Sequence, residues 1–113
     1  MAHRELEDRL GEAITLSNLG HFYLRQGRCQ EAASHLQQAI VLSRELGDQA
    51  IEAAALTNLG ETYYRQGYYA EAVDHQRQAL ILSREIGHRR FEAARTRARA
   101  RRSSTGSSLD SGL

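Results

Sequence analysis

The chain has 113 residues, no proline and a formal net charge of +1. This length fits one domain, and the apolar residues are dominated by alanine and leucine, which favour helices. No apolar stretch approaches the roughly eighteen residues of a membrane span, and the N-terminus lacks the basic and apolar segments of a secretory signal. We therefore expect a cytoplasmic protein with no membrane partner, in which the single Cys29 forms no internal disulfide.

A stretch of forty residues occurs twice in succession. Residues 12–51 align with residues 52–91 without a gap, and twenty of the forty positions are identical. A period of this length is typical of repeat architectures, in which each unit buries its apolar face against its neighbours. Proteins of this kind usually bind other molecules.

Within each copy the apolar residues recur three and four positions apart, which is the period of a helix. Gly27 and Gly67 separate two helical stretches in each copy, and Gly47 followed by Asp48 is typical of a helix end followed by an N-cap. The pattern predicts helices over residues 8–26, 29–46, 49–66 and 69–86, and a further helix over residues 89–101. The expected fold is all-α, a superhelix or solenoid of antiparallel helix pairs.

Gly20 and Gly60 lie inside predicted helices, where glycine costs roughly 1 kcal/mol relative to alanine. Their recurrence at equivalent positions indicates that a second helix crosses there too closely for a Cβ atom. Ala32 and Ala72 are the small residues expected opposite them. The alternative is that the two glycines recur by chance.

The shared pattern resembles the tetratricopeptide repeat (TPR) family. The first copy carries it as Leu16, Leu19-Gly20, Tyr23, Ala32 and Leu36. The second carries Leu56, Leu59-Gly60, Tyr63 and Ala72 but departs from the pattern at Gln76. The forty-residue period exceeds the common period of about 34, and no proline follows the second helix. Both departures resemble the longer-helix subgroup found in kinesin light chains, polarity adaptors and bacterial signalling regulators.

The repeats divide the chain into five segments. Residues 1–11 form the tail of a preceding repeat or the start of the first helix, residues 12–51 and 52–91 form the two repeats, residues 92–102 form a partial third repeat or a basic capping helix, and residues 103–113 form a disordered tail. The chain is then either a piece of a longer array or a pair of repeats with its own capping helix. Two complete repeats are fewer than the three usually needed for stability, so exposed ends favour self-association.

The resemblance implies a scaffold that binds a protein or peptide partner along the concave side lined by the first helix of each pair. In the first repeat this peptide-binding face is predicted to carry Ser17, Asn18, His21, Leu24 and Arg25. In the second repeat the equivalent residues are Thr57, Asn58, Glu61, Tyr64 and Arg65. All fifteen basic residues are arginine, a bias typical of a GC-rich coding sequence. The bias favours a bacterial source, and the resemblance to bacterial signalling regulators implies that the chain is part of a larger bacterial regulatory protein.

Asn18 and Asn58 are the strongest candidates, because an amide side chain offers both a donor and an acceptor to a peptide backbone. The alternative is that they bind a neighbouring helix or water. Arg25 and Arg65 either recognise carboxylates or satisfy free carbonyls at helix ends. Tyr64 and Tyr69 have no fixed packing role, and they either form part of a contact surface or cover the turn between helices.

The sequence offers no sign of enzymatic activity. It has no glycine-rich phosphate loop, no paired-cysteine zinc spacing and no His-Glu-x-x-His, so we expect no cofactor and no metal site. His35 and His75 are equivalent residues without a ligand-spaced partner and are interpreted as surface histidines. The competing function is nucleic-acid binding by the arginines between Arg89 and Arg102. Apart from Phe91, however, that segment has no aromatic residue for base stacking.

Overall fold

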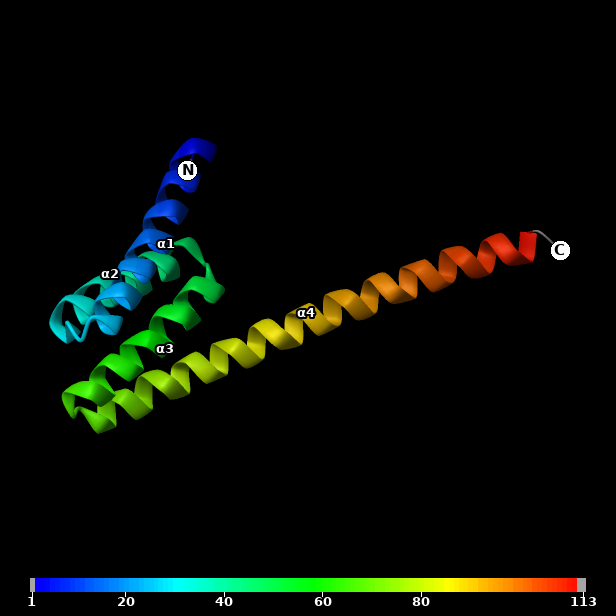
Figure 1. Cartoon of the computed structure of the whole chain (residues 1–113). Helices are drawn as coiled ribbons and strands as arrows, with labels where there is room; N and C mark the ends of the chain where they lie inside the picture. Colours follow the sequence, from blue (N-terminus) through cyan, green and yellow to red (C-terminus); the bar gives the residue numbers. More distant parts are fainter. Residues whose placement is uncertain (1, 112–113) are drawn as a thin grey trace. The chain divides into compact units, whose positions relative to one another are not determined.

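The computed structural model describes residues 2–111, with side chains described for residues 2–103. Four helices account for nearly all of this part of the chain: α1 (His3–Arg25), α2 (Cys29–Leu46), α3 (Gln49–Gln66) and α4 (Tyr69–Ser111). No strand occurs among the described residues. The expected all-α fold built from antiparallel helix pairs is confirmed (Figure 1).

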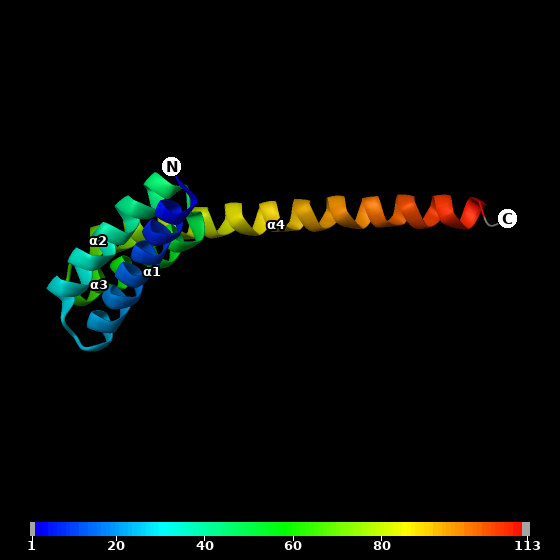
Figure 2. The same cartoon turned by 90° about the horizontal axis from the view of Figure 1, so that it is seen from above.

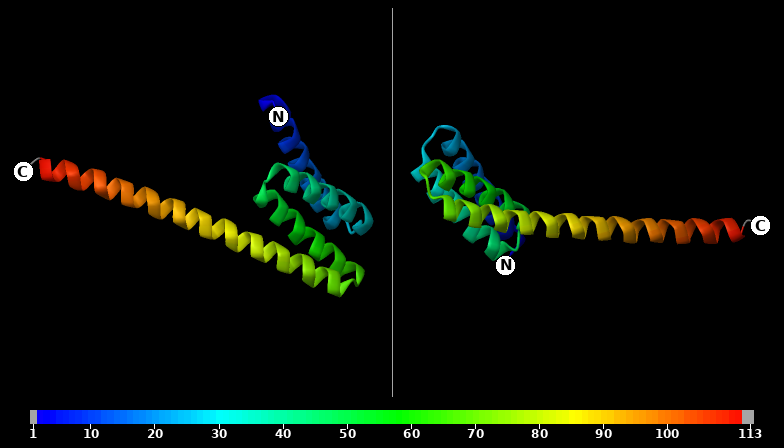
Figure 3. Two further views of the ribbon diagram at one scale, coloured as in Figure 1. Left: turned by 180° about the vertical axis from the view of Figure 1, so that it is seen from behind. Right: turned by 90° about the horizontal axis from the view of Figure 1, so that it is seen from below.

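The chain divides into two parts after Ser83, and each is described separately. The first part contains α1, α2, α3 and the beginning of α4. Consecutive helices run antiparallel in this part, and α1, α2 and α3 pack side by side (Figure 2). Figure 3 shows the hairpin that α3 forms with the beginning of α4. The second part, residues 84–111, consists of the remainder of α4.

The three turns share one geometry, and it comes from glycine. Gly27, Gly47 and Gly67 all adopt positive φ, at 77°, 70° and 86°. In each turn the N–H of the residue after the glycine donates to a carbonyl of the last helical turn at 2.9 Å. Asp48 also accepts a 3.0 Å bond from the Ile51 backbone N–H and so caps α3. The predicted bounds of the second and third helices are confirmed.

The predicted boundary at Gly87 is wrong. Unlike the three turn glycines, Gly87 is not in the left-handed region, and α4 continues through it. The two equivalent glycines differ in the residue after them, because Gly47 precedes the capping Asp48 whereas Gly87 precedes His88. The arginine- and alanine-rich sequence beyond also favours helix. One helix therefore replaces the two predicted over residues 69–86 and 89–101.

The bounds of the first and last helices also differ from those predicted. Helix α1 begins at His3, five positions before the predicted start, so residues 3–11 belong to the first helix. At the other end, α4 extends to Ser111 across most of the segment predicted to be disordered. The rest of that segment, residues 112 and 113, lies outside the described residues.

The core lies between the two repeats. Its larger buried residues are Leu24, Leu36, Ile40, Leu56 and Leu59, and alanines fill the space between them. Leu16, Tyr23, Tyr63 and Leu82 pack around it and remain partly exposed. Among the described residues, no helix combines the length and the apolarity that a membrane span requires.

The close approach predicted at the helical glycines is confirmed. Ala32 lies opposite Gly20 as predicted, although Leu36 is nearer, whereas the prediction of Ala72 opposite Gly60 is wrong. A Cβ added to Gly20 would lie 2.6 Å from Leu36 Cδ2 and 3.3 Å from the carbonyl oxygen of Ala32. A Cβ added to Gly60 would lie 2.8 Å from Gln76 Cγ, and Ala72 is not among its nearest neighbours. The second helix of each pair therefore contacts the glycine with a long side chain.

This difference predicts unequal effects for the same substitution at the two glycines. Leu36 is fully buried and cannot move away, whereas Gln76 is exposed and flexible. We expect Gly20→Ala to lower the free energy of unfolding by about 1 to 2 kcal/mol, the cost of overpacking less the gain in helix propensity. Gly60→Ala should change it by less than about 0.5 kcal/mol. Urea denaturation followed by circular dichroism measures both, and equal losses would contradict the assigned contacts.

Candidate functional site

Six of the predicted site residues form an exposed or half-exposed polar face on the two first helices, which we call the polar ladder. It comprises Asn18, His21 and Arg25 of α1 and Asn58, Glu61 and Arg65 of α3. Helices α1 and α3 are in direct contact. The repeat packing therefore brings residues forty positions apart onto one surface.

Side chains of the polar ladder join across the two repeats. His21 Nδ1 lies 3.4 Å from Asn58 Oδ1, and Arg25 Nε donates to His21 Nε2 at 3.4 Å. A neutral imidazole protonated on Nδ1 satisfies both contacts. Both distances are long for hydrogen bonds, so these groups can exchange partners at little cost. Asn18 is exposed and makes no side-chain hydrogen bond within the described part of the chain.

Arg65 is fixed by the neighbouring repeat. Its Nη1 donates to the backbone carbonyl of Leu24 at 2.9 Å, and its Nη2 donates to Glu61 Oε1 at 3.0 Å. The carbonyl belongs to the last turn of α1 and also accepts a hydrogen bond from the backbone N–H of Gly27 at 3.0 Å. Arg65 therefore caps the first helix of the preceding repeat, whereas its equivalent Arg25 contacts only His21.

The prediction that Ser17 and Leu24 lie on the binding surface is wrong. Ser17 is 8% exposed and Leu24 is 1% exposed, so neither can contact a ligand on the surface. The reason is α3, which packs against α1 and α2 and covers this side of the first repeat. The equivalent residues of the second repeat, Thr57 and Tyr64, are exposed as predicted.

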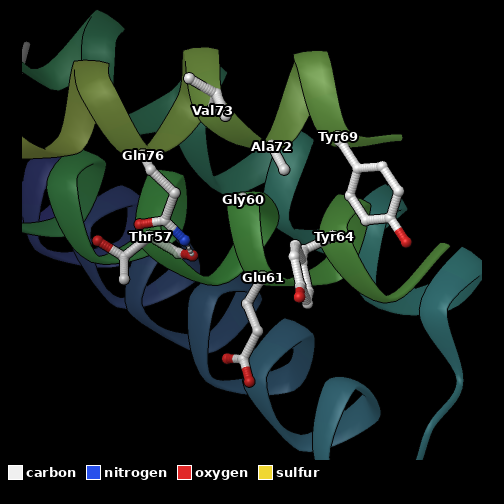
Figure 4. Close-up of a pocket in the computed structure, with 8 residues that line it drawn as sticks. All are labelled: Thr57, Gly60, Glu61, Tyr64, Tyr69, Ala72, Val73 and Gln76. Carbon is white, nitrogen blue, oxygen red and sulfur yellow. Dashed lines mark hydrogen bonds between the residues drawn. The ribbon is translucent and has the colours of Figure 1, made fainter. Parts of the chain in front are cut away.

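Thr57 and Tyr64 belong to a second surface, a groove between α3 and the beginning of α4. The groove has a volume of about 660 Å³, and Figure 4 shows the residues around it. They are Thr57, Gly60, Glu61, Tyr64, Tyr69, Ala72, Val73 and Gln76. Glu61 belongs to both surfaces, so the groove adjoins the polar ladder.

The lining of the groove is mostly apolar. The rings of Tyr64 and Tyr69 meet edge to face, with centroids 5.3 Å apart. Gln76 donates from Nε2 to the backbone carbonyl of Thr57 at 3.2 Å, which ties the two walls together (Figure 4). We call this surface the α3–α4 groove.

The sequence analysis missed four of the lining residues, Gly60, Ala72, Val73 and Gln76. A signal for them was present. The lining positions on α3 and on α4 are each spaced i, i+3, i+4 and i+7, which is one face of a helix. Two such faces side by side form the kind of surface against which a third helix packs.

His35 and His75 are both structural. The Nδ1 atom of His35 lies 2.8 Å from the carbonyl oxygen of Glu31, and that of His75 lies 2.7 Å from the carbonyl oxygen of Glu71. The two rings pack 5.1 Å from Tyr23 and Tyr63, respectively. No cluster of metal-ligating side chains is found in the part of the chain that the structure describes.

The arginine-rich segment lies in the second part of the chain, within α4. Arg95, Arg97 and Arg99 are exposed and follow each other at intervals of two residues. Residues spaced i, i+4 and i+7 share one side of a helix, so Arg95, Arg99 and Arg102 lie on one side of α4, and Arg97 and Arg101 lie on another.

A sequence model of the tetratricopeptide repeat family matches residues 11–85, which span both helix pairs. The chain belongs to the tetratricopeptide repeat family. No curated protein sequence matches it significantly. TPR domains generally serve as scaffolds for protein–protein contacts and are generally not catalytic. In this TPR protein, the polar ladder and the α3–α4 groove are two candidate surfaces for such contacts.

The different environments of Arg65 and Arg25 give a matched pair of substitutions. Arg65→Ala removes the bond to the Leu24 carbonyl, and we expect it to lower the free energy of unfolding by about 1 kcal/mol. Arg25→Ala, at the same position of the other first helix, should lower it by less than about 0.5 kcal/mol. Chemical denaturation measures both losses. A larger loss for Arg25→Ala would show that the role of Arg65 is misassigned.

Proposed function

We propose that this TPR protein is a binding module that holds an extended segment of a partner protein along the polar ladder. The observation that carries the proposal is the joining of α1 and α3 side chains on one exposed face, with His21 Nδ1 3.4 Å from Asn58 Oδ1. A continuous polar surface across two repeats matches the length of a peptide better than that of a small molecule.

The chemistry of the polar ladder suits a peptide backbone. Asn18 and Asn58 each offer an amide N–H and a carbonyl oxygen, which complement the carbonyl and N–H of an extended chain. Such bonds do not depend on the partner's side chains. Affinity from this source is therefore compatible with many partner sequences.

Charge adds selectivity at one end of the polar ladder. Arg25 is exposed and contacts only the His21 ring through a long bond, so its guanidinium remains available for a carboxylate. Arg65 is less available, because it already binds Leu24 and Glu61. We therefore expect the partner segment to place an acidic side chain or a terminal carboxylate beside Arg25.

The wider setting of the module is also part of the proposal. The forty-residue period supports membership of the long-repeat TPR subgroup, and the exclusive use of arginine supports a bacterial source. A bacterial regulatory protein acting in the cytoplasm, in which these repeats dock a partner, fits both features.

Selection from a random display library of 12-residue peptides tests the proposal. We expect the full chain to enrich peptides that bind it in solution, as measured by fluorescence anisotropy with the labelled peptides. Asn18→Ala and Asn58→Ala should each weaken binding by about tenfold, because each loses hydrogen bonds to the peptide backbone.

Gln38→Ala is the matched control, since Gln38 is an exposed amide that bonds only to Ser34 within its own helix. It should leave the affinity unchanged. Failure to enrich any peptide, or equal binding by the asparagine variants and the wild type, would refute the proposal.

A further inference from the structure

The two repeats differ in which of their equivalent residues are buried, and the difference maps the interface between them. On α3, Leu59 is 1% exposed and Thr62 is 0% exposed. Their equivalents on α1 are Leu19, which is 37% exposed, and Phe22, which is 54% exposed. Leu59 and Thr62 are buried because α3 has a repeat before it to pack against. Leu19 and Phe22 belong to the same face of a first helix, and here this face is uncovered.

The opposite side of the interface shows the reverse pattern. Leu24 is buried on the first repeat, whereas its equivalent in the α3–α4 groove, Tyr64, is 64% exposed. Likewise Leu36 is buried, whereas its equivalent Gln76 is exposed. The α3–α4 groove is therefore the surface that, on the first repeat, α3 covers.

We propose that the α3–α4 groove binds α1 of a second copy of this chain. Helix α3 fills the corresponding groove of the first repeat, and α1 is the helix whose sequence repeats that of α3. No helix follows α4 among residues 2–111 to take this place. The contact between copies thus continues the contact between repeats.

The polar contacts of the existing interface have compatible counterparts in the proposed one. Within the chain, His21 lies beside Asn58. In the proposed contact, the equivalent of His21 is Glu61 of one copy, forty positions later. The equivalent of Asn58 is Asn18 of the next copy, forty positions earlier. An asparagine amide N–H donates well to a carboxylate, and the exposed Asn18 has no other side-chain bond in the described chain.

The second counterpart involves the helix cap. Arg65 donates to the carbonyl of Leu24 at the end of α1. At the end of α3 the equivalent carbonyl is that of Tyr64, and the equivalent arginine is Arg25 of the next copy. The guanidinium is retained at this position in both repeats, although only Arg65 has a neighbouring repeat to cap.

A third pair completes the set. Gln37 Nε2 donates to the hydroxyl oxygen of Tyr63 at 2.8 Å. Its counterpart joins Arg77 of one copy to Tyr23 of the next, and a guanidinium donates to a hydroxyl oxygen as readily as an amide does. All three contacts thus keep a donor opposite an acceptor.

Such a contact joins two different surfaces. An open assembly therefore keeps one unused surface at each of its two ends. Interfaces of this type build open chains unless the rotation between copies closes a ring. We expect the mean mass of the full chain, measured by light scattering or sedimentation velocity, to rise with concentration past the dimer over about 1 to 500 μM.

Two substitutions each block one surface. Phe22→Glu places a charge on the uncovered face of α1 that carries Leu19 and Phe22, which we call the α1 face, and Val73→Glu places one in the α3–α4 groove. Each should weaken self-association by at least about tenfold, because the charge must be buried without a partner. Val41→Glu is the control, since Val41 is a similarly exposed apolar residue that belongs to neither surface.

Mixing the two blocked variants is the decisive experiment. The Phe22→Glu copy keeps its groove and the Val73→Glu copy keeps its α1 face, so together they should form a 1:1 complex that grows no further. Circular dichroism checks that both variants remain helical. If either unfolds, Leu19→Lys and Tyr64→Lys replace them at the same two surfaces.

Three outcomes overturn the inference: a wild-type chain that stays monomeric throughout, a dimer that neither substitution weakens, or blocked variants that do not combine. The contact between copies shares Asn18, Arg25 and Glu61 with the polar ladder, but Phe22 and Val73 lie outside it, so their substitutions test self-association without removing a peptide-binding side chain. A wild-type monomer that binds peptides would refute only self-association, and a monomeric Phe22→Glu variant that binds none would refute only peptide binding.

Discussion

Helix α3 buries Leu56 and Leu59 against the first repeat, and most other features of the structure follow from this contact. The contact also covers Leu24, which lies in the core that both repeats share. It brings Arg65 to the end of α1, where its guanidinium donates a second hydrogen bond to the Leu24 carbonyl. It places the first helices in contact, so that their polar side chains share one face. Each single repeat offers too little apolar surface for such a core.

The same contact divides the surface into regions with different roles. The polar ladder crosses the boundary between the repeats, so its geometry depends on how α1 and α3 pack. The α3–α4 groove and the α1 face are the two halves of the inter-repeat contact, each left without its complement. The polar ladder and the contact between copies share Asn18, Arg25 and Glu61. Peptide binding and association through the other two surfaces therefore compete for these side chains.

Local signals predicted most of the fold. A glycine at each turn, a capping Asp48 and the helical spacing of leucines placed α2 and α3 correctly, because these features act over a few residues. Burial was harder to predict, since it depends on the neighbouring repeat. Leu19 and Leu59 have the same place in the pattern, yet only Leu59 has a repeat to pack against. For the same reason Leu24 was assigned to the surface and proved to be core.

The most direct test of this account compares Leu59→Ala with Leu19→Ala in dilute solution, by urea denaturation followed by circular dichroism. The substitution, the helix type and the position within the repeat are identical, so only the neighbouring repeat differs. We expect Leu59→Ala to lower the free energy of unfolding by about 2 to 4 kcal/mol and Leu19→Ala to lower it by less than about 1 kcal/mol. Equal losses at the two positions would contradict the claim that packing between the repeats holds the structure together.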